Sequence, residues 1–118
     1  MTNVLVCGGG SGGHLYPALA VLDALRAHPG VGCTGFAGTR RALDARVFAK
    51  RPEIAFFRLH ARSLRGGLPA KLLGLGALGL GLAQSLAALA RLRPGLVLGT
   101  GGYSSVPPLL AARELGTP

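Results

Sequence analysis

Two glycine-rich segments and one histidine are the residues of this chain best suited to chemistry. The first segment runs from Gly8 to Gly13 and is followed directly by His14, and the second runs from Gly99 to Tyr103. Glycine has no Cβ, so backbone N–H groups in such loops can approach a ligand closely. A helix that starts behind the loop adds free amide donors and a partial positive charge. Two such loops predict a cleft for an anionic ligand larger than one phosphate.

His14 lies at the end of the first loop, where a helix is predicted to begin. A histidine beside a phosphate site suits a general base, or a donor of one hydrogen bond to a bound ligand. The alternative is a histidine that only caps or packs. Its position directly after a glycine loop favours the functional interpretation.

The first loop also fits a dinucleotide-binding fingerprint. Gly8, Gly10 and Gly13 match the Gly-x-Gly-x-x-Gly spacing, which alone is a weak indication. That fingerprint expects an acidic residue after the second strand, where this chain has Arg40 and Arg41. NAD is therefore disfavoured, but the two arginines could bind the 2′-phosphate of NADP, so an NADP-binding domain stays an alternative.

The acidic residues do not suggest a metal site. They are Asp23, Asp44, Glu53 and Glu114, and none is in a glycine loop. The sequence contains no Asp-x-Asp pair that could hold a divalent metal on a diphosphate, and no Gly-x-x-x-x-Gly-Lys-Ser/Thr run. We therefore expect neither a metal nor a cofactor.

Short apolar runs alternate with helix-like stretches along the chain. We expect strands at 3–7, 32–37, 54–59 and 96–99, and helices at about 15–27, 39–50, 69–93 and 106–115. Pro17 should fit the first turn of the first helix, and Thr39 should cap the second. Four strand–helix units predict an α/β fold, a Rossmann-like parallel sheet flanked by helices with right-handed crossovers. Both glycine loops would then lie at the carboxyl ends of the strands, where ligands bind.

Amino-acid composition and net charge limit the kinds of molecule that this chain is expected to bind. The chain has 118 residues, of which 49% are hydrophobic and 14% charged, enough for one domain with a core. The formal net charge of +9 suits a phosphorylated ligand or anionic lipid, although it could also reflect genome composition. The few aromatic residues form no base-stacking pattern with basic ones, so we expect no nucleic-acid partner. Cys7 and Cys33 are expected at opposite ends of neighbouring strands, as two separate buried thiols.

A long apolar segment lies within the third predicted helix. No residue from Leu72 to Ala90 is charged, and Lys71 and Arg91 flank this run. As a helix it would be roughly 28 Å long, nearly the thickness of a bilayer core. It could cover the sheet and also contact a membrane, cover the sheet only, or span a membrane. The alternating strand–helix pattern argues against a spanning helix. Because the segment is apolar on all sides, the first interpretation is favoured, with neighbouring basic residues meeting anionic lipid.

The glycine loops carry a family resemblance. The run from Gly9 to Ala20, GGSGGHLYPALA, resembles the opening of the MurG family, the peptidoglycan N-acetylglucosaminyltransferases that make lipid II from lipid I. The second loop, the Gly38-Thr39 pair and Leu64-Arg65-Gly66 match in order and spacing. The resemblance covers essentially the whole chain. It implies that residues 1–118 are most of the N-terminal, acceptor-binding domain of a two-domain GT-B glycosyltransferase, whose donor-binding C-terminal domain lies outside this chain.

The resemblance also implies a role for each matching residue. His14 is the candidate catalytic base or positioning group. The residues expected to border the donor diphosphate are Ser11, Gly12 and Gly13. Those expected to bind the acceptor are Gly10, Gly101, Gly102, Tyr103 and Ser104. The expected membrane patch comprises Arg65, Lys71, Leu72, Leu73 and Leu75.

The implied reaction is the inverting transfer of GlcNAc from UDP-GlcNAc to the 4-hydroxyl of MurNAc in lipid I. The implied partners are UDP-GlcNAc, a lipid-linked diphosphate acceptor and the anionic cytoplasmic face of the cell membrane, where the protein would be peripheral. The sequence departs from the family at Ser11, usually Thr, at Asp44, often Glu, and in the glycines of the patch helix. Besides the NADP-binding domain, two alternatives remain: a standalone acceptor- or membrane-binding subunit of a split glycosyltransferase, and a non-enzymatic membrane-surface protein.

Overall fold

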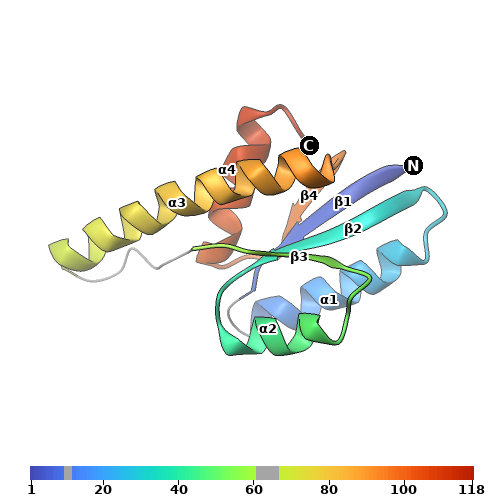
Figure 1. Cartoon of the computed structure of the whole chain (residues 1–118), viewed down its shortest axis with the longest axis horizontal. Helices are drawn as coiled ribbons and strands as arrows, with labels where there is room; N and C mark the ends of the chain where they lie inside the picture. The colour runs from blue at the N-terminus through green and yellow to red at the C-terminus, as the bar shows by residue number, and fades with distance from the viewer. Residues whose placement is uncertain (10–11, 61–66) are drawn as a thin grey trace.

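The computed structural model describes residues 1–9, 12–60 and 67–118, in which strands and helices alternate (Figure 1). The elements are β1 (Thr2–Cys7), α1 (Gly12–Arg26), β2 (Val31–Gly38), α2 (Ala42–Ala49), β3 (Ala55–Arg58), α3 (Leu68–Leu92), β4 (Leu96–Gly99), the 3₁₀ turn η1 (Tyr103–Ser105) and α4 (Val106–Glu114). The strands form one parallel sheet in the order β3-β2-β1-β4. The predicted Rossmann-like α/β fold is confirmed.

Side chains of β1 alternate between the two faces of the sheet. Val4 and Val6 pack with α1 and α2, whereas Leu5 and Cys7 pack with α3 and α4. All four are at most 2% exposed. Figure 1 shows the resulting three layers, with one pair of helices on each face of the sheet. The strict alternation of β1 therefore builds both halves of the core.

The parallel sheet brings the loops that carry the predicted site to one edge. Cys7, the last residue of β1, pairs with Gly99, the last residue of β4. Because these two strands are neighbours, the first and second glycine loops leave the sheet side by side. The loops after β2 and β3 leave from the same edge.

Helix α3 has two different halves. Its C-terminal half packs on the sheet through Ala88, Leu89 and Leu92, each at most 8% exposed. Its N-terminal half projects beyond the sheet (Figure 1), and Leu72 and Leu73 there are 60% and 56% exposed. By length and composition alone, Lys71–Leu92 could cross a membrane. The packing of its second half on the core favours a covering helix with a projecting end.

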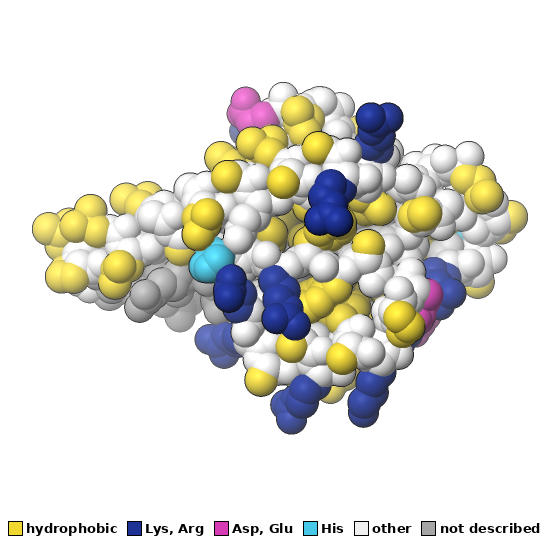
Figure 2. All heavy atoms as spheres, viewed as in Figure 1, with side chains coloured by type: hydrophobic (Ala, Val, Ile, Leu, Met, Phe, Trp, Pro, Cys, Tyr) yellow, Lys and Arg dark blue, Asp and Glu magenta, His cyan; other side chains and the backbone are white. Residues whose placement is uncertain are grey.

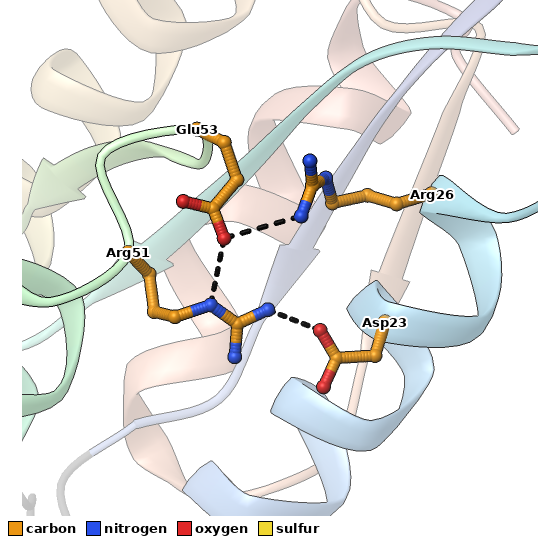
Figure 3. A network of polar contacts seen from close by, with 4 residues as sticks. All are labelled: Asp23, Arg26, Arg51 and Glu53. Carbon is orange, nitrogen blue, oxygen red and sulfur yellow. Dashed lines mark hydrogen bonds and ion pairs between the residues drawn. The ribbon is translucent and has the colours of Figure 1, made fainter.

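An ion-pair network fastens α1 to the segment before β3 (Figure 3). Glu53 accepts hydrogen bonds from Arg51 at 2.7 Å and Arg26 at 3.1 Å, and Arg51 also pairs with Asp23. The hydrogen bond from Arg51 lowers the pKa of the Glu53 carboxyl. The network lies where α1 ends and β3 is about to begin, at the edge of the sheet opposite the glycine loops.

Three local predictions were wrong. Pro17 lies inside α1, which already begins at Gly12, so its ring removes a hydrogen bond that a helix interior normally makes. Thr39 does not cap α2, because its side chain binds Asp44 and the cap residue is Arg41. Cys33 is exposed rather than buried, whereas Cys7 is buried as expected.

Candidate active site

Thr100 links the two glycine loops. Its N–H donates to the carbonyl oxygen of Cys7 at 2.9 Å. Its Oγ1 lies 2.9 Å from the carbonyl oxygen of His14, and 3.3 Å from those of Cys7 and Gly8. A hydroxyl has one hydrogen to donate, and the shortest of these contacts is the one to His14. The first turn of α1 is therefore held against the end of β4.

The His14 ring lies against the second loop. A Cβ added at Gly101 would lie 3.2 Å from Cε1 and Nδ1 of His14, and one at Gly102 would lie 3.0 Å from its Cδ2. Both glycines also have positive φ, +113° and +80°, a region that residues with a side chain rarely adopt. Glycine at these two positions thus permits both the turn and the close packing of the imidazole against the loop.

Two serine hydroxyls complete the junction of the loops. Ser104 is buried and donates to the carbonyl oxygen of Gly9 at 3.1 Å, and Ser105 donates to that of Gly101 at 2.7 Å. Ser104 was predicted to bind the acceptor, but its hydroxyl is directed into the protein. Its visible role is to fix the first loop relative to the second.

A buried acid joins the loop after β2 to the same junction. The Asp44 carboxylate is fully buried and its Oδ2 accepts from the N–H and hydroxyl of Thr39, at 2.7 and 2.8 Å. A Cβ at Gly9 would lie 2.1 Å from this oxygen, so only glycine allows so close an approach. Sequence reasoning assigned neither Asp44 nor Thr100 to the site. The departure from the family at Asp44 was the one signal that pointed to it.

Cys7 forms the floor of the junction. Its Sγ lies 3.6 Å from the carbonyl oxygen of Leu98 and 4.0 Å from that of Ser105. Burial raises the pKa of the Cys7 thiol to about 11, against a smaller lowering by the hydrogen bond with Ser105. The thiol is therefore an uncharged packing group at neutral pH.

The predicted site residues divide into three groups. Gly12, Gly13 and His14 form the first turn of α1, where the His14 ring lies against Gly101 and Gly102, whereas Ser104 bonds to Gly9. Lys71, Leu72, Leu73 and Leu75 lie exposed on the projecting half of α3. Gly10, Ser11 and Arg65 lie outside the described residues, as does the side chain of Tyr103, whose backbone begins η1.

The junction offers anion-binding chemistry. The first amides of α1 have no partner within the helix, and no acidic side chain occupies its first turn. They adjoin the half-buried His14 ring, which can exchange a proton with a ligand. Among the described residues, no three His, Cys, Asp or Glu side chains come together as a metal site would require.

A family model matches this arrangement over nearly the whole chain. The model for the glycosyltransferase family 28 N-terminal domain covers residues 4–118. The chain belongs to this family. Its fold is therefore that of the N-terminal domain of a family 28 glycosyltransferase.

The relatives of this family 28 chain have longer sequences. It is 42% identical over 118 residues to the UDP-N-acetylglucosamine--N-acetylmuramyl-(pentapeptide) pyrophosphoryl-undecaprenol N-acetylglucosamine transferase of Magnetococcus marinus, covering 98% of this chain and 31% of that protein. It is 40% identical over 115 residues to the transferase of the same name from Citrifermentans bemidjiense, with coverages of 96% and 32%. The chain thus spans about a third of the length of these relatives, and the resemblance to the MurG family is confirmed.

Solved structures agree with this assignment. MurG of Acinetobacter baumannii superimposes with a TM-score of 0.77 at 26% identity, over 100% of this chain and 34% of that one. The Streptomyces glycosyltransferase SsfS6 superimposes with a TM-score of 0.66 at 24% identity, over 100% of this chain and 38% of that one, which shows the fold alone. The Rossmann-like domain found here thus recurs in more than one glycosyltransferase.

Proposed function

We propose that this chain is the acceptor side of an inverting glycosyltransferase that transfers GlcNAc from UDP-GlcNAc to the 4-hydroxyl of MurNAc in lipid I, forming lipid II. The names and identities of the transferase relatives support the substrates. The seat of the His14 imidazole on Gly101 and Gly102 is the observation that carries the proposal. It joins a group that can accept a proton to two loops that can bind diphosphates.

In the proposed reaction, the oxygen of the acceptor hydroxyl attacks the anomeric carbon of GlcNAc. The bond from that carbon to the UDP oxygen breaks, and UDP leaves with the bonding electrons. The acceptor proton passes to a free ring nitrogen of His14. Amide donors at the first turn of α1, Gly12 and Gly13, would face the departing diphosphate. Attack opposite to the leaving group inverts the anomeric configuration.

The second loop would bind the diphosphate of the acceptor. Gly101 and Gly102 expose backbone near His14, so a sugar attached to a diphosphate held there would lie close to the imidazole. Ser104 would act from behind, by positioning Gly9. Gly10, Ser11 and Tyr103 complete the proposed set, with Ser11 on the donor side.

The length of the relatives supports placing the donor and acceptor contacts in two different domains. The chain spans 31% of the length of the Magnetococcus transferase. We place most donor contacts in a second domain and expect the 118-residue chain alone to bind no more than the acceptor side. Closure of two domains would then bring donor and acceptor together.

Replacing His14 in a transferase that contains this chain tests the base role. His14→Ala should lower turnover at least tenfold, since general acid–base catalysis contributes about 10²–10⁴-fold, with circular dichroism and melting temperature retained. His14→Gln should be as impaired, because an amide preserves hydrogen bonding but accepts no proton. His28→Ala, an exposed histidine at the far end of α1, should leave turnover unchanged. Full activity of His14→Gln would instead make His14 a positioning residue.

The membrane part of the proposal rests on the projecting half of α3. Leu72, Leu73 and Leu75 are 55–60% exposed and Lys71 is exposed beside them. Exposed leucines with an adjacent cation suit a shallow contact with an anionic bilayer. The protein would then be peripheral at the cytoplasmic face of the cell membrane, with Arg65 as a further candidate contact.

Vesicle sedimentation tests this contact. The double variant Leu72→Gln, Leu73→Gln should bind vesicles containing phosphatidylglycerol at least tenfold more weakly than the parent chain, since two leucines lose their burial in lipid. Leu109→Gln, which removes an exposed leucine from α4, is the matched control and should bind normally. Equal binding by the double variant would remove α3 from the proposal.

A further inference from the structure

A cluster of polar side chains lies apart from the glycine loops, at the far side of the same sheet edge. Gly38 and Arg58 end β2 and β3 and pair with each other. Arg40 and His60 each follow two residues later, and the Nη1 of Arg40 lies 3.2 Å from the Nε2 of His60. Two strand spacings separate β3 from β1, so the cluster lies on the order of 10 Å from the first glycine loop.

Gln84 of α3 fixes the tautomer of His60. The backbone N–H of His60 donates to Oε1 of Gln84 at 2.7 Å, which sets the orientation of the side-chain amide. The amide nitrogen then lies 2.8 Å from Nδ1 of His60. Because an amide NH₂ group only donates, Nδ1 must accept, and the ring proton of the neutral imidazole sits on Nε2.

This tautomer leaves two donors facing each other, and neither can accept from the other. The Nε2–H of His60 and the guanidinium of Arg40 both donate, and a guanidinium has no acceptor atom. Within the described ranges, none of the ion pairs includes Arg40. Two donors that converge at 3.2 Å form a stable arrangement when one oxygen accepts from both.

A hollow adjoins the cluster. It has a volume of about 260 Å³ between β3 and α3, and its lining includes Phe56, Phe57, Arg58, Gln84 and Arg91. Figure 2 shows this face, where Lys and Arg side chains surround an apolar floor. Gln84 therefore lies both against His60 and in the wall of the hollow, which has aromatic residues at its base and arginines at its border.

We propose that Arg40 and His60 bind an oxyanion, a carboxylate or phosphate oxygen that accepts from both, as one end of a ligand whose remainder lies in the hollow beside Gln84. The site is separate from His14 and the glycine loops. It does not rest on the proposed transfer reaction, because its argument uses only the donors, the tautomer and the hollow.

The first test concerns the tautomer. In the 15N-labelled 118-residue chain, long-range 1H–15N spectra at a pH where the ring is neutral should show the proton of His60 on Nε2. The variant Gln84→Leu removes the amide and should allow the Nδ1–H form to appear. A proton on Nδ1 in the parent chain would overturn the proposal, because Nε2 would then accept from Arg40.

The second test is a titration with inorganic phosphate and, separately, with acetate. Saturable shifts of the His60 signals should appear with at least one of the two, and Arg40→Gln should weaken this binding about tenfold, the effect of one charge-assisted hydrogen bond. Arg41→Gln is the matched control, since it removes the neighbouring exposed charge, and should weaken binding less than twofold. Tighter saturation by phosphate would assign a phosphorylated ligand, and tighter saturation by acetate a carboxylate.

Two outcomes would overturn this site and leave the transfer reaction untouched. One is the absence of saturable shifts at His60 with either anion while signals of Gly101 and Gly102 shift. The other is equal weakening by Arg40→Gln and Arg41→Gln, which would mean general attraction to positive charge. Conversely, saturable binding that needs Arg40 would stand even if His14→Ala left turnover unchanged.

Discussion

The glycine loops and the projecting half of α3 are both rich in glycine, yet they use it in opposite ways. At Gly8, φ is +130° and an added Cβ would lie 2.1 Å from Oγ1 of Thr100. At Gly76 and Gly79 an added Cβ would meet nothing within 4 Å. In the loops, glycine is required by the backbone and by close neighbours. At Gly76 and Gly79 it only lowers the helix propensity.

The glycine loops are held in place by hydrogen bonds, whereas the first half of α3 is left exposed. The hydroxyls of Thr100 and Ser104 join the second loop to backbone carbonyls of His14 and Gly9, and the hydroxyl of Ser105 bonds to Gly101 within the second loop. The first half of α3 presents leucines to solvent instead. Rigid positioning suits a site that must orient reacting groups, and an open apolar surface suits contact with another phase or partner.

Gly8→Ala should have the largest effect. The methyl group must displace Thr100 while the backbone stays in a region that alanine disfavours, so we expect a loss of roughly 3–5 kcal/mol in unfolding free energy. Urea denaturation followed by circular dichroism would measure it. A loss below 1 kcal/mol would mean that the loops can move apart to admit the methyl group. Glycine would then not be required in the loops, and they would not differ from α3 in this respect.

The buried thiol predicts a pH effect at the loop junction. The folded-state pKa of Cys7 is about 11, against a reference value of 9.0. The unfolded chain therefore releases the proton first, and this difference should lower stability by roughly 2–3 kcal/mol as pH rises from about 9 to 11. The measurement is the difference between the parent chain and Cys7→Ala in urea denaturation at each pH.

A matched thiol provides the control for this effect. Cys33 is exposed, so iodoacetamide should modify it in the native chain while Cys7 stays protected, and Cys33→Ala should follow the pH profile of the parent. Parallel profiles of the parent and Cys7→Ala would contradict the assigned burial.

Thr100→Val should cost about 1–2 kcal/mol. Valine keeps the shape of the side chain but removes the hydroxyl group, which donates a hydrogen bond to the His14 carbonyl oxygen. The amide signals of the first turn of α1 should shift in 1H–15N spectra. Thr2→Val, at an exposed position, should change stability by less than about 0.5 kcal/mol.

Gly76→Ala should have the smallest effect and the opposite sign. The helix gains the propensity of alanine and no clash arises, so stability should rise by about 0.5–1 kcal/mol. Thermal unfolding of the variant beside Gly8→Ala compares the two uses of glycine directly. A drop in melting temperature would show that another group occupies the space beside Gly76 and clashes with the added methyl group.

The alternation of strands and helices was predictable because apolar periodicity and the Pro and Gly breaks are local. The start of α1 is less predictable, because the glycines that begin it are poor helix formers and the apolar spacing starts only at Leu15. The seat of His14 on Gly101 and Gly102 needed the resemblance or the sheet order, since it depends on β4 lying next to β1.

The remaining side-chain contacts could not be read from sequence. The meeting of Asp44 with Gly9 depends on how α2 packs across the sheet. The cluster of Arg40, His60 and Gln84 depends on the register of β2 with β3 and on the position of α3. Each contact joins segments whose separation along the chain carries no local pattern.

The ion-pair network of Figure 3 balances its own charge, because Arg26 and Arg51 match Asp23 and Glu53. Asp23 and Glu53 lie at the edge of the sheet opposite the glycine loops, and Glu114 ends α4, which also runs away from that edge. At the carboxyl-end edge Asp44 is buried, whereas Arg40, Arg41 and Arg58 are exposed, and among the described residues no ion pair includes these three arginines. An approaching anion would be turned toward that edge before contact, and this guidance would weaken once added salt shortens the Debye length to about 10 Å at 0.1 M.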